Sequence, residues 1–384
     1  MALNYDLDEE QQILRSSVRK FAEDVIKPVA RELDDKEEFS YDTMKRMAEM
    51  GLFGVFVSPE YGGQGLDYVS YIIATEEIAR VDGSHAATVA AGNSLGIGPL
   101  NYYGSEEQKK KYLPKLCAGQ GLWGFGLTEP DAGSDAGGSK TTAVLDGNHW
   151  VINGSKIFIT NAACKISMGV TVQAVTGKRP NGKKELSCFL VEHGTKGFTA
   201  KEMHGKLMWR SSNTAELYFD DCRIPKENLL GKQGDGFHQM LATLDGGRLS
   251  IGAMGLGCAQ GAFDLALAYS QERQQFGQPI CKFQAIAFKL ADMAMEIELA
   301  RNLMYKAGWL RDNRRPFARE AAMAKLYCSE LARRVSNHAV QIHGGYGLMK
   351  EYDVERFYRD AKLLEIGEGT SEVQRIVISR QIGC

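Results

Sequence analysis

The stretch IGAMGLGCAQGAFDLALAY, residues 251–269, decides the fold class. Its apolar residues recur at intervals of three and four, which places them on one face of an α-helix. Two later runs repeat the spacing. The three stripes are Ile251, Met254, Cys258, Ala262, Leu265 and Tyr269; Ile286, Leu290, Met293, Ile297, Ala300 and Met304; and Ala324, Cys328, Leu331 and Val335. Three or four such helices form an antiparallel bundle, so we interpret the stripes as core.

The segment before the bundle has a different pattern. Between about Gly121 and Gly231 the chain is rich in β-branched and aromatic residues, interrupted by turn residues. The run from Thr141 to Gly154 predicts a hairpin that turns at Asp146-Gly147. Further strand-like runs cover residues 168–175, 186–192 and 215–219. Since no helical spacing separates them, they indicate a small antiparallel sandwich or barrel.

The first 120 residues return to helical spacing. Leu14, Val18, Phe21 and Val25 share one helical face. Helices are expected over residues 8–31, 41–50, 68–79, 86–95 and 106–116. The chain is therefore expected to be α+β, mostly α, with an N-terminal helical domain (1–120), a central antiparallel β domain (121–231) and a C-terminal four-helix bundle domain (232–384).

Composition excludes several classes of protein. The 384 residues are 44% hydrophobic with a formal charge of -2, as in ordinary globular proteins, and short basic runs lie beside acidic residues, so nucleic acid is not an expected partner. No uninterrupted apolar run approaches the length of a membrane span, and the first residues have neither the basic lead nor the apolar core that would predict a targeting segment. We expect a cytoplasmic protein, or a mitochondrial matrix protein if a transit peptide was removed. Scattered cysteines and histidines predict no metal site.

The stretch EIGEGTSE, residues 365–372, carries the strongest chemical signal. Two glycines flank Glu368, and each costs a helix about 1 kcal/mol relative to alanine. Glycines let a backbone approach a ligand closely, so Glu368 is interpreted as a carboxylate aimed into a cavity from a loop between helices. The alternative is a helix break with Gly369 as its C-cap.

Four further stretches have the residue types of a binding site. They are FGLTEPDAGSD (125–135), KIFITN (156–161), ERQQFG (272–277) and QIHGGYG (341–347). Taken alone, each could be a turn or a helix cap. The glycines at 252, 255 and 257 lie within a helical stripe rather than after a strand, and no GxxxxGK[ST] loop is present, so Rossmann and P-loop nucleotide sites are disfavoured.

Taken together, six motifs resemble the acyl-CoA dehydrogenase family, and within it the short-chain or butyryl-CoA dehydrogenase branch. In order they are FGLTEPDAGSD, FIT, LDGGR, ERQQFGQPICKFQ, QIHGGYG and EGTSEVQR, and the resemblance spans essentially the whole chain. It implies the three-domain fold described above, FAD as cofactor, an acyl-CoA substrate and electron-transferring flavoprotein as electron acceptor. It also implies a homotetramer built as a dimer of dimers.

The resemblance assigns residues to the cofactor and to the substrate. The implied FAD contacts are Phe125, Leu127, Thr128, Ser134, Phe158, Ile159, Thr160, Arg273, Gln284, Gln341, Gly344, Gly345, Thr370 and Glu372, of which Arg273 and Gln284 would reach the FAD of a neighbouring subunit. The implied substrate contacts are Ser134, Phe237, Asp245, Gly246, Gly247, Arg248, Gly367, Gly369 and Gly96. Phe158 stands where family members usually carry tryptophan, so its contact with the flavin is expected to be smaller.

The same resemblance implies the chemistry. Glu368 is expected to remove the α-proton of the thioester, while the β-hydride passes to flavin N5. The enolate charge would be met by the backbone N–H of the base and a ribityl hydroxyl of FAD. One branch of the family carries its base at the position of Gly247, and glycine cannot abstract a proton. Glu368 therefore has no rival as the base.

Several alternatives remain open at this stage. An acyl-CoA oxidase would use the same base but pass electrons to oxygen. A non-catalytic acyl-CoA-binding flavoprotein would need to have lost the base or the FGLTEPDAGSD loop, here called the flavin loop. A purely structural four-helix protein would not need this loop. Some relatives run in reverse as enoyl-CoA reductases. A decarboxylating variant also stays open, although no obvious additional arginine would hold a second carboxylate.

Two glycines suggest an unusual acyl pocket. Gly367 and Gly96 stand where relatives often carry tyrosine. Two missing rings would widen the cavity near Cα and Cβ, which suits a branched or cyclic acyl group such as cyclohexane-1-carboxyl-CoA rather than straight-chain butyryl-CoA. Alternatively, Trp209 and Met208 fill the space.

Overall fold

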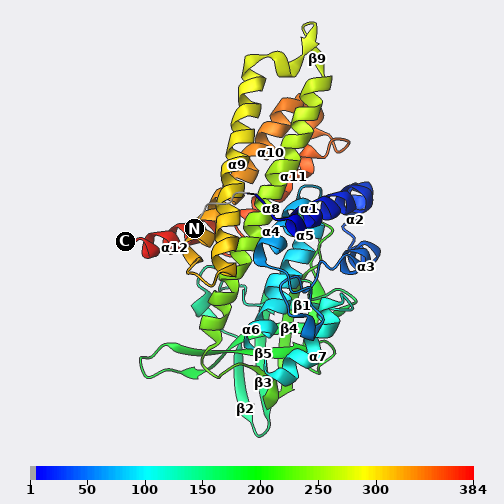
Figure 1. Ribbon diagram of the computed structural model, residues 1–384. Coiled ribbons are helices and arrows are strands. Elements are labelled where there is room, and N and C mark those ends of the chain that lie inside the picture. Colours follow the sequence, from blue (N-terminus) through cyan, green and yellow to red (C-terminus); the bar gives the residue numbers. More distant parts are fainter. Residues whose placement is uncertain (1–5) are drawn as a thin grey trace.

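The computed structural model describes residues 6–384, and its first part is a layer of helices (Figure 1). They are α1 (Glu9–Phe21), α2 (Lys27–Lys36), α3 (Tyr41–Glu49), α4 (Tyr68–Ala79), α5 (Gly83–Ala91), α6 (Gly98–Tyr103) and α7 (Glu106–Cys117). Two π-helical turns, η1 (Ala22–Ile26) and η3 (Gly92–Ile97), join α1 to α2 and α5 to α6. Asp8, Asp67 and Ser105 accept hydrogen bonds from the first turns of α1, α4 and α7, which fixes where these helices begin.

The second part is a mixed sheet. Its strands are β1 (Leu122–Gly126), β2 (Thr142–Asp146), β3 (His149–Thr160), β4 (Ser167–Lys178), β5 (Lys184–Glu192), β6 (Phe198–Glu202), β7 (Thr214–Pro225) and β8 (Leu229–Leu230). The order is β6-β7-β3-β2-β4-β5-β8, and β1 pairs with β4. Most pairs are antiparallel, as the sequence predicts, and the β2–β3 hairpin forms. The β1–β4 and β2–β4 pairs are instead parallel, because another strand intervenes in the chain each time and no hairpin forces the paired strands to oppose each other.

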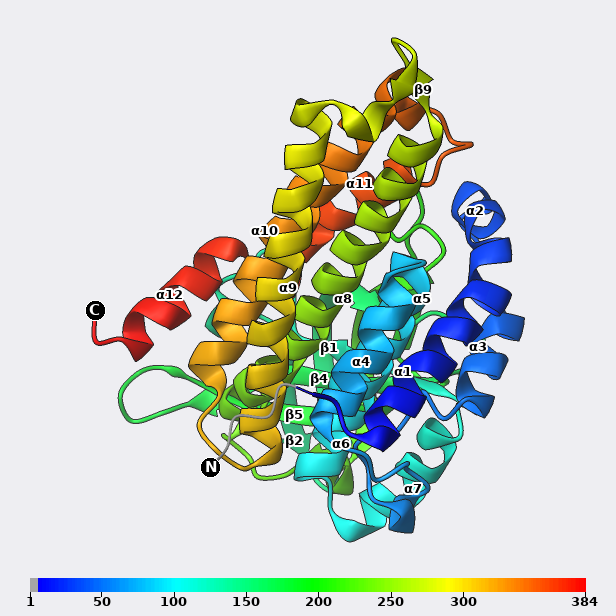
Figure 2. The same ribbon diagram turned by 45° about the horizontal axis from the view of Figure 1, so that its top comes forward.

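The third part is a bundle of long helices that begins where the sheet ends. Its helices are α8 (Gly236–Glu272), α9 (Gln284–Asp312), α10 (Ala318–His343), α11 (Val354–Leu364) and α12 (Ser371–Gln381). A small hairpin, β9 (Gln274–Gln275) and β10 (Gln278–Pro279), caps the upper end of α8 and α9 (Figures 1 and 2). The predicted stripes are confirmed, because Met254, Met293 and Cys328 and most of their stripe neighbours are buried.

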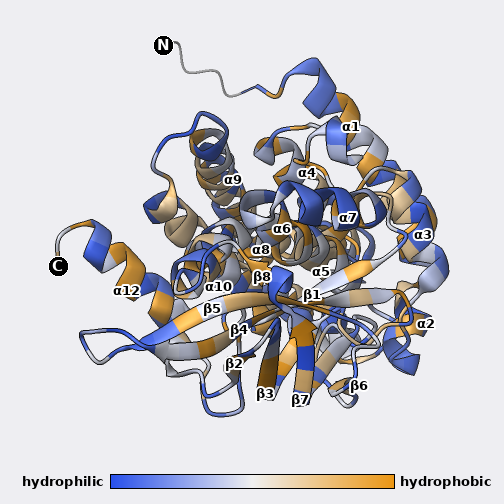
Figure 3. Ribbon diagram, turned by 90° about the horizontal axis from the view of Figure 1, so that it is seen from below, coloured by the Kyte–Doolittle hydropathy of each residue, from blue (hydrophilic) through white to orange (hydrophobic). Residues whose placement is uncertain are grey.

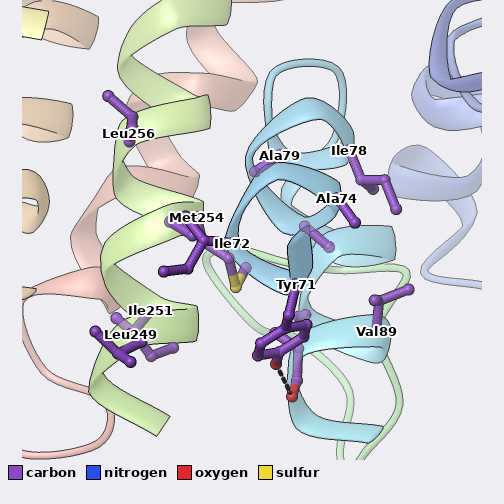
Figure 4. Packing of buried hydrophobic residues seen from close by; sticks show 14 of the residues in the cluster. Tyr71, Ile72, Ala74, Ile78, Ala79, Val89, Leu249, Ile251, Met254 and Leu256 are labelled. Carbon is purple, nitrogen blue, oxygen red and sulfur yellow. Dashed lines mark hydrogen bonds between the residues drawn. The ribbon is translucent and has the colours of Figure 1, made fainter. Parts of the chain in front are cut away.

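The core joins all three parts. Figure 4 shows Tyr71, Ile72 and Ala79 of α4 facing Leu249 and Met254 of α8. Glycines let the helices approach closely, since a Cβ at Gly255 would lie 2.8 Å from the main chain of Cys328. Viewed from below, the strands lie in front of the bundle helices (Figure 3). Buried residues alternate with more exposed ones along much of β3 and β7.

Among the described residues, α8 is the helix long and apolar enough by composition to cross a bilayer. In this fold 67% of its apolar window is buried, because it packs against α4, α9 and α10. We therefore interpret α8 as the central core helix.

Candidate active site

Glu368 lies in the short loop between α11 and α12. Its backbone adopts the left-handed conformation, with φ of 52°, which costs a non-glycine residue of order 1–3 kcal/mol. The surroundings hold the loop in place. The Gln374 amide donates to the carbonyl oxygens of Glu368 (3.2 Å) and Gly369 (2.9 Å), and the Thr370 hydroxyl caps α12 by accepting from the Val373 N–H (3.3 Å). Strained residues held this firmly cluster at functional sites.

The Glu368 carboxylate points at α8. Its Oε2 is buried and has no hydrogen-bond partner in residues 6–384. A Cβ built on Gly247 would overlap this oxygen, so glycine at position 247 leaves room for the carboxylate where it now lies. The Glu368 carboxylate thus fills the volume that a side chain at position 247 would occupy, which agrees with the pairing of these two positions that the family resemblance implies.

The pKa of Glu368 lies well above its ordinary value. Burial raises it to about 7, and the nearby charges of Lys325 and Arg248 oppose this rise. A carboxylate with a pKa near 7 is matched to proton abstraction at neutral pH. The backbone N–H of Glu368 is also free, because it donates to no group of the described chain.

The segment of α8 beside Glu368 carries the predicted substrate contacts. Asp245 and Arg248 form an ion pair, and partial burial of Asp245 raises the pKa of its carboxyl. Phe237 is half-exposed in the first turn of α8, where its ring lies 3.8 Å from the position of a Cβ on Gly137. Gly137 follows the FGLTEPDAGSD loop, so the start of α8 lies beside the end of this loop, where Ser134 is exposed.

The two predicted flavin segments lie side by side. The Ile157 N–H donates to the Thr128 carbonyl (3.0 Å), which joins FIT to the loop that follows β1. Phe125 is buried at the end of β1, and Leu127 and Thr128 are partly exposed. Phe158 is 62% exposed in the left-handed conformation, with φ of 61°, at an irregularity in the β3–β7 pairing. An exposed aromatic ring held in this way fits a flat ligand.

A buried ion pair supports this flavin loop. Lys156 donates to the Glu129 carboxylate (2.7 Å) and to the Leu127 carbonyl (3.1 Å). Glu129 also accepts from the backbone N–H of Lys140 (2.6 Å) and Thr141 (3.1 Å). Burial alone would raise the pKa of Glu129, but the Lys156 charge and these hydrogen bonds lower it to about 2.

The other predicted flavin contacts gather at the far end of the bundle. A pocket of about 500 Å³ there is lined by Arg273, Gly344 and Gly345 together with the rings of His343 and Tyr346. The Arg273 guanidinium lies over the Tyr346 ring at 5.6 Å. The 11 residues of α11, a length of about 16 Å, separate this pocket from the Glu368 loop. Gln284 and Gln341 are exposed on neighbouring elements and do not line it. Thr370 and Glu372 remain at the start of α12.

One expectation about the acyl pocket is wrong. A Cβ at Gly96 would lie 2.6 Å from the Trp123 carbonyl oxygen, so this glycine allows η3 to pack against β1 and opens no space for an acyl group. A Cβ at Gly367 would meet only Leu363, at ordinary distances of 3.5 Å and more. Trp209 packs near Gly83, Met254 and Asp360, and no atom of Trp209 is among the nearest to Gly367.

Three charged residues near the site were not assigned a role from the sequence. Lys325 is buried in an apolar stripe of α10, and Lys156 lies beneath the flavin loop. Arg311, at the end of α9, stacks over Tyr68 at 3.6 Å, with its Nη1 2.6 Å from the position of a Cβ on Gly246. An arginine therefore does lie beside Gly246, one of the predicted substrate contacts. A lysine inside an apolar helical stripe was the one signal that could have revealed Lys325.

Family models match nearly all of the chain. They are the acyl-CoA dehydrogenase N-terminal domain (residues 8–120), middle domain (124–222) and C-terminal domain (234–383). Among curated proteins, the probable acyl-CoA dehydrogenase YngJ of Bacillus subtilis is 53% identical, over 99% of this chain and 100% of its own.

Two solved structures are similar as well. Butyryl-CoA dehydrogenase from Megasphaera elsdenii aligns with a TM-score of 0.95 and 42% identity, over 99% of this chain and 100% of its own. An acyl-CoA dehydrogenase from Bacillus anthracis complexed with FAD aligns with a TM-score of 0.92 and 35% identity, over 99% of this chain and 68% of its own.

Proposed function

Since the chain belongs to the acyl-CoA dehydrogenase family, we propose that it oxidises a short-chain acyl-CoA thioester between Cα and Cβ, with FAD as cofactor and Glu368 as base. The observation that carries this proposal is the Glu368 carboxylate, whose Oε2 is buried in the space that Gly247 leaves and has no hydrogen-bond partner among the described residues. The similarity to a butyryl-CoA dehydrogenase favours a short acyl chain.

The residues present fit a flavin. The exposed Phe158 ring and the loop from Leu127 to Ser134 would hold the ring system, and the pocket at Arg273, Gly344 and Gly345 would hold the distal part of a flavin that belongs to a neighbouring subunit. When bound, FAD supplies the acceptor for the β-hydride. The chain's own residues then do the remaining work of positioning and proton transfer.

Glu368 performs the proton transfer. The α-proton of a thioester is a very weak acid, so the site must stabilise the enolate charge as the proton leaves. The free N–H of Glu368 is a suitable donor for the thioester oxygen. When the acyl group expels water from the site, this hydrogen bond becomes stronger. The loss of water also makes the Glu368 carboxylate a stronger base for the α-proton.

Partners and assembly follow from the family resemblance and the surface. We propose electron-transferring flavoprotein as the electron acceptor. The outer face of α9 exposes Phe288 (62%), Met295 (57%) and Leu299 (57%), apolar residues that a neighbouring copy would cover in a homotetramer.

The test is the substitution Glu368→Gln. We expect the variant to keep its fold and its flavin but to lose at least 10²-fold in turnover, because an amide cannot accept the proton. Bleaching of the flavin absorption by butyryl-CoA measures this. The matched control is Glu365→Gln, whose carboxylate pairs with Arg333 and Lys362 outside the pocket, and which should retain turnover. A Glu368→Gln variant with more than about a tenth of wild-type activity would refute the proposal. Rapid reoxidation in air would instead indicate an acyl-CoA oxidase.

Gly367 supports a second, more specific proposal: the acyl pocket is wide enough for a branched or cyclic acyl group. A Cβ at this position has room, and no atom of Trp209 or Met208 is among its nearest neighbours. We expect cyclohexane-1-carboxyl-CoA to be preferred over butyryl-CoA by tenfold or more in kcat/KM, given about 1–3 kcal/mol per methylene in an apolar pocket. Gly367→Tyr should reverse this preference. If wild type uses butyryl-CoA best and rejects the cyclic thioester, the pocket is an ordinary short-chain one.

A further inference from the structure

A buried lysine lies directly behind the Glu368 loop. Lys325 is on α10, between Ala324 and Cys328 of the apolar stripe, and its side chain is fully buried. Its ammonium group donates a hydrogen bond of 2.7 Å to the carbonyl oxygen of Gly369, the residue after Glu368. Burial lowers the pKa of Lys325 to about 8, so the residue is maintained at an energetic cost.

Support of the loop alone does not explain a charged residue here. The neutral amide of Gln374 already donates to the Gly369 carbonyl (2.9 Å) and to the Glu368 carbonyl (3.2 Å). A second neutral donor would suffice if the loop needed only another hydrogen bond. Lysine adds a positive charge, which an apolar environment otherwise disfavours.

The charges around the site show where that positive charge acts. Glu368 is the carboxylate that interacts most strongly with Lys325, ahead of Glu365 and Glu372. These carboxylates raise the pKa of Lys325, whereas the positive charge of Arg248 lowers it. In the described chain Lys325 forms no ion pair, whereas Arg248 on α8 is paired with Asp245. Conversely, Lys325 and Arg248 are the cations that act on Glu368. Tyr71 of α4 is another polar side chain that faces Glu368, and its hydroxyl donates instead to the Ala90 carbonyl (2.8 Å), so it supplies no charge to the site.

We propose that Lys325 is a positioning residue for the dehydrogenation: its ammonium group fixes the carbonyl behind Glu368 and supplies the positive potential that lets Glu368 ionise inside an apolar pocket. This inference rests on the proposed role of Glu368 as base. Without Lys325, the carboxylate would be protonated over a wider pH range, and less of the enzyme would be competent near neutral pH.

Three substitutions separate the charge from the hydrogen bond. Lys325→Gln keeps a donor without the charge, Lys325→Met removes both, and Lys325→Arg keeps both. The matched control is Lys206→Met, because burial also lowers the pKa of Lys206 to about 8, and this lysine donates to the Ser212 carbonyl and to the Thr214 hydroxyl at the start of β7. All variants are studied as holoenzyme, with flavin content measured first.

Two readouts report the ionisation of Glu368. One is difference infrared spectroscopy of the carboxyl band without acyl-CoA, with Glu368→Gln as the reference; the other is the pH dependence of kcat/KM. We expect Lys325→Gln and Lys325→Met to raise the midpoint by about one pH unit or more in both. Lys325→Arg should restore most of the wild-type midpoint, and Lys206→Met should not move it.

A loss of activity at all pH values with an unchanged midpoint in Lys325→Gln would overturn the inference and leave Lys325 as loop support alone. A shift of the midpoint in Lys206→Met as large as the shift in Lys325→Met would also overturn the inference. Because the infrared titration needs no turnover, it still measures the effect of Lys325 if Glu368 proves not to be the base. Failure of the proposed function would instead appear as full activity in Glu368→Gln.

Discussion

At the scale of single residues, the site depends on two positions that must be considered together. The sequence indicated Glu368 as base because glycine at 247 excludes the alternative position, and the structure adds that a Cβ at 247 would collide with the Glu368 carboxylate. Lys325 could not be assigned in the same way. A stripe pattern reports which face is buried, but it does not report which carbonyl a buried ammonium group meets.

Gly247→Ala tests this shared space. Alanine is favoured over glycine within a helix by about 1 kcal/mol, so α8 should remain intact. The added methyl group should displace the carboxylate, and we expect kcat to fall about 10²-fold with flavin retained. Gly98→Ala is the control, since a Cβ there would make only ordinary contacts, at 3.5 Å and more. Unchanged turnover in Gly247→Ala would mean that Glu368 does not work from this position.

At the scale of elements, apolar periodicity predicted the long helices and missed the short ones. The predicted helix over residues 68–79 coincides with α4, and the bundle stripes lie on α8, α9 and α10. Helix α6 was missed because it begins with Gly98-Pro99 and spans six residues, too short for a periodic signal. The parallel pairing of β1 with β4 could not be predicted either, because it depends on how separate parts of the chain meet in space.

The flavin loop is an element organised by charge. The pKa of Glu129 is about 2 in the folded protein and about 4.3 in an unfolded chain. The ionised carboxylate is therefore more stable in the folded protein than in the unfolded chain, and its ionisation adds to the free energy of unfolding. Its contribution is therefore complete above about pH 5 and is lost as the pH falls towards 2. The pair with Lys156 should matter for the free energy of unfolding at neutral pH and progressively less in acid.

Glu129→Gln measures this contribution. At pH 7 we expect a lower melting temperature and weaker flavin retention, with a loss of unfolding free energy of about 3 kcal/mol, since a charged lysine is left unpaired. The difference from wild type should shrink below pH 5. Asp131→Asn is the matched control, because its pair with Lys140 (2.8 Å) is exposed and should contribute about 0–1 kcal/mol. Equal effects of the two substitutions would contradict a special role for the buried pair.

At the scale of the whole molecule, the predicted flavin contacts divide between two places. Phe158, Thr128 and their neighbours lie at the sheet, whereas Arg273, Gly344 and Gly345 line the pocket at the far end of the bundle, about 16 Å or more from the Glu368 loop along α11. The family resemblance implies that Arg273 reaches the flavin of a neighbouring subunit. A flavin shared in this way, as we propose, would account for both groups of contacts.

Arg273→Ala tests whether flavin binding and assembly depend on each other. Arg273 is exposed at the end of α8 and lies over the Tyr346 ring at 5.6 Å, so its removal should leave the bundle core of each chain intact. If it reaches a neighbour's flavin, the variant should lose FAD affinity and assembly together, because a ligand that binds only the assembled state stabilises that state. Light scattering, flavin titration and the rise of Tm with added FAD measure the three effects. Arg223→Ala, which removes an exposed pair with Asp146 on the sheet, should change none of them. A tetrameric Arg273→Ala protein with full flavin and an unchanged Tm would show that Arg273 does not hold the flavin of a neighbouring copy.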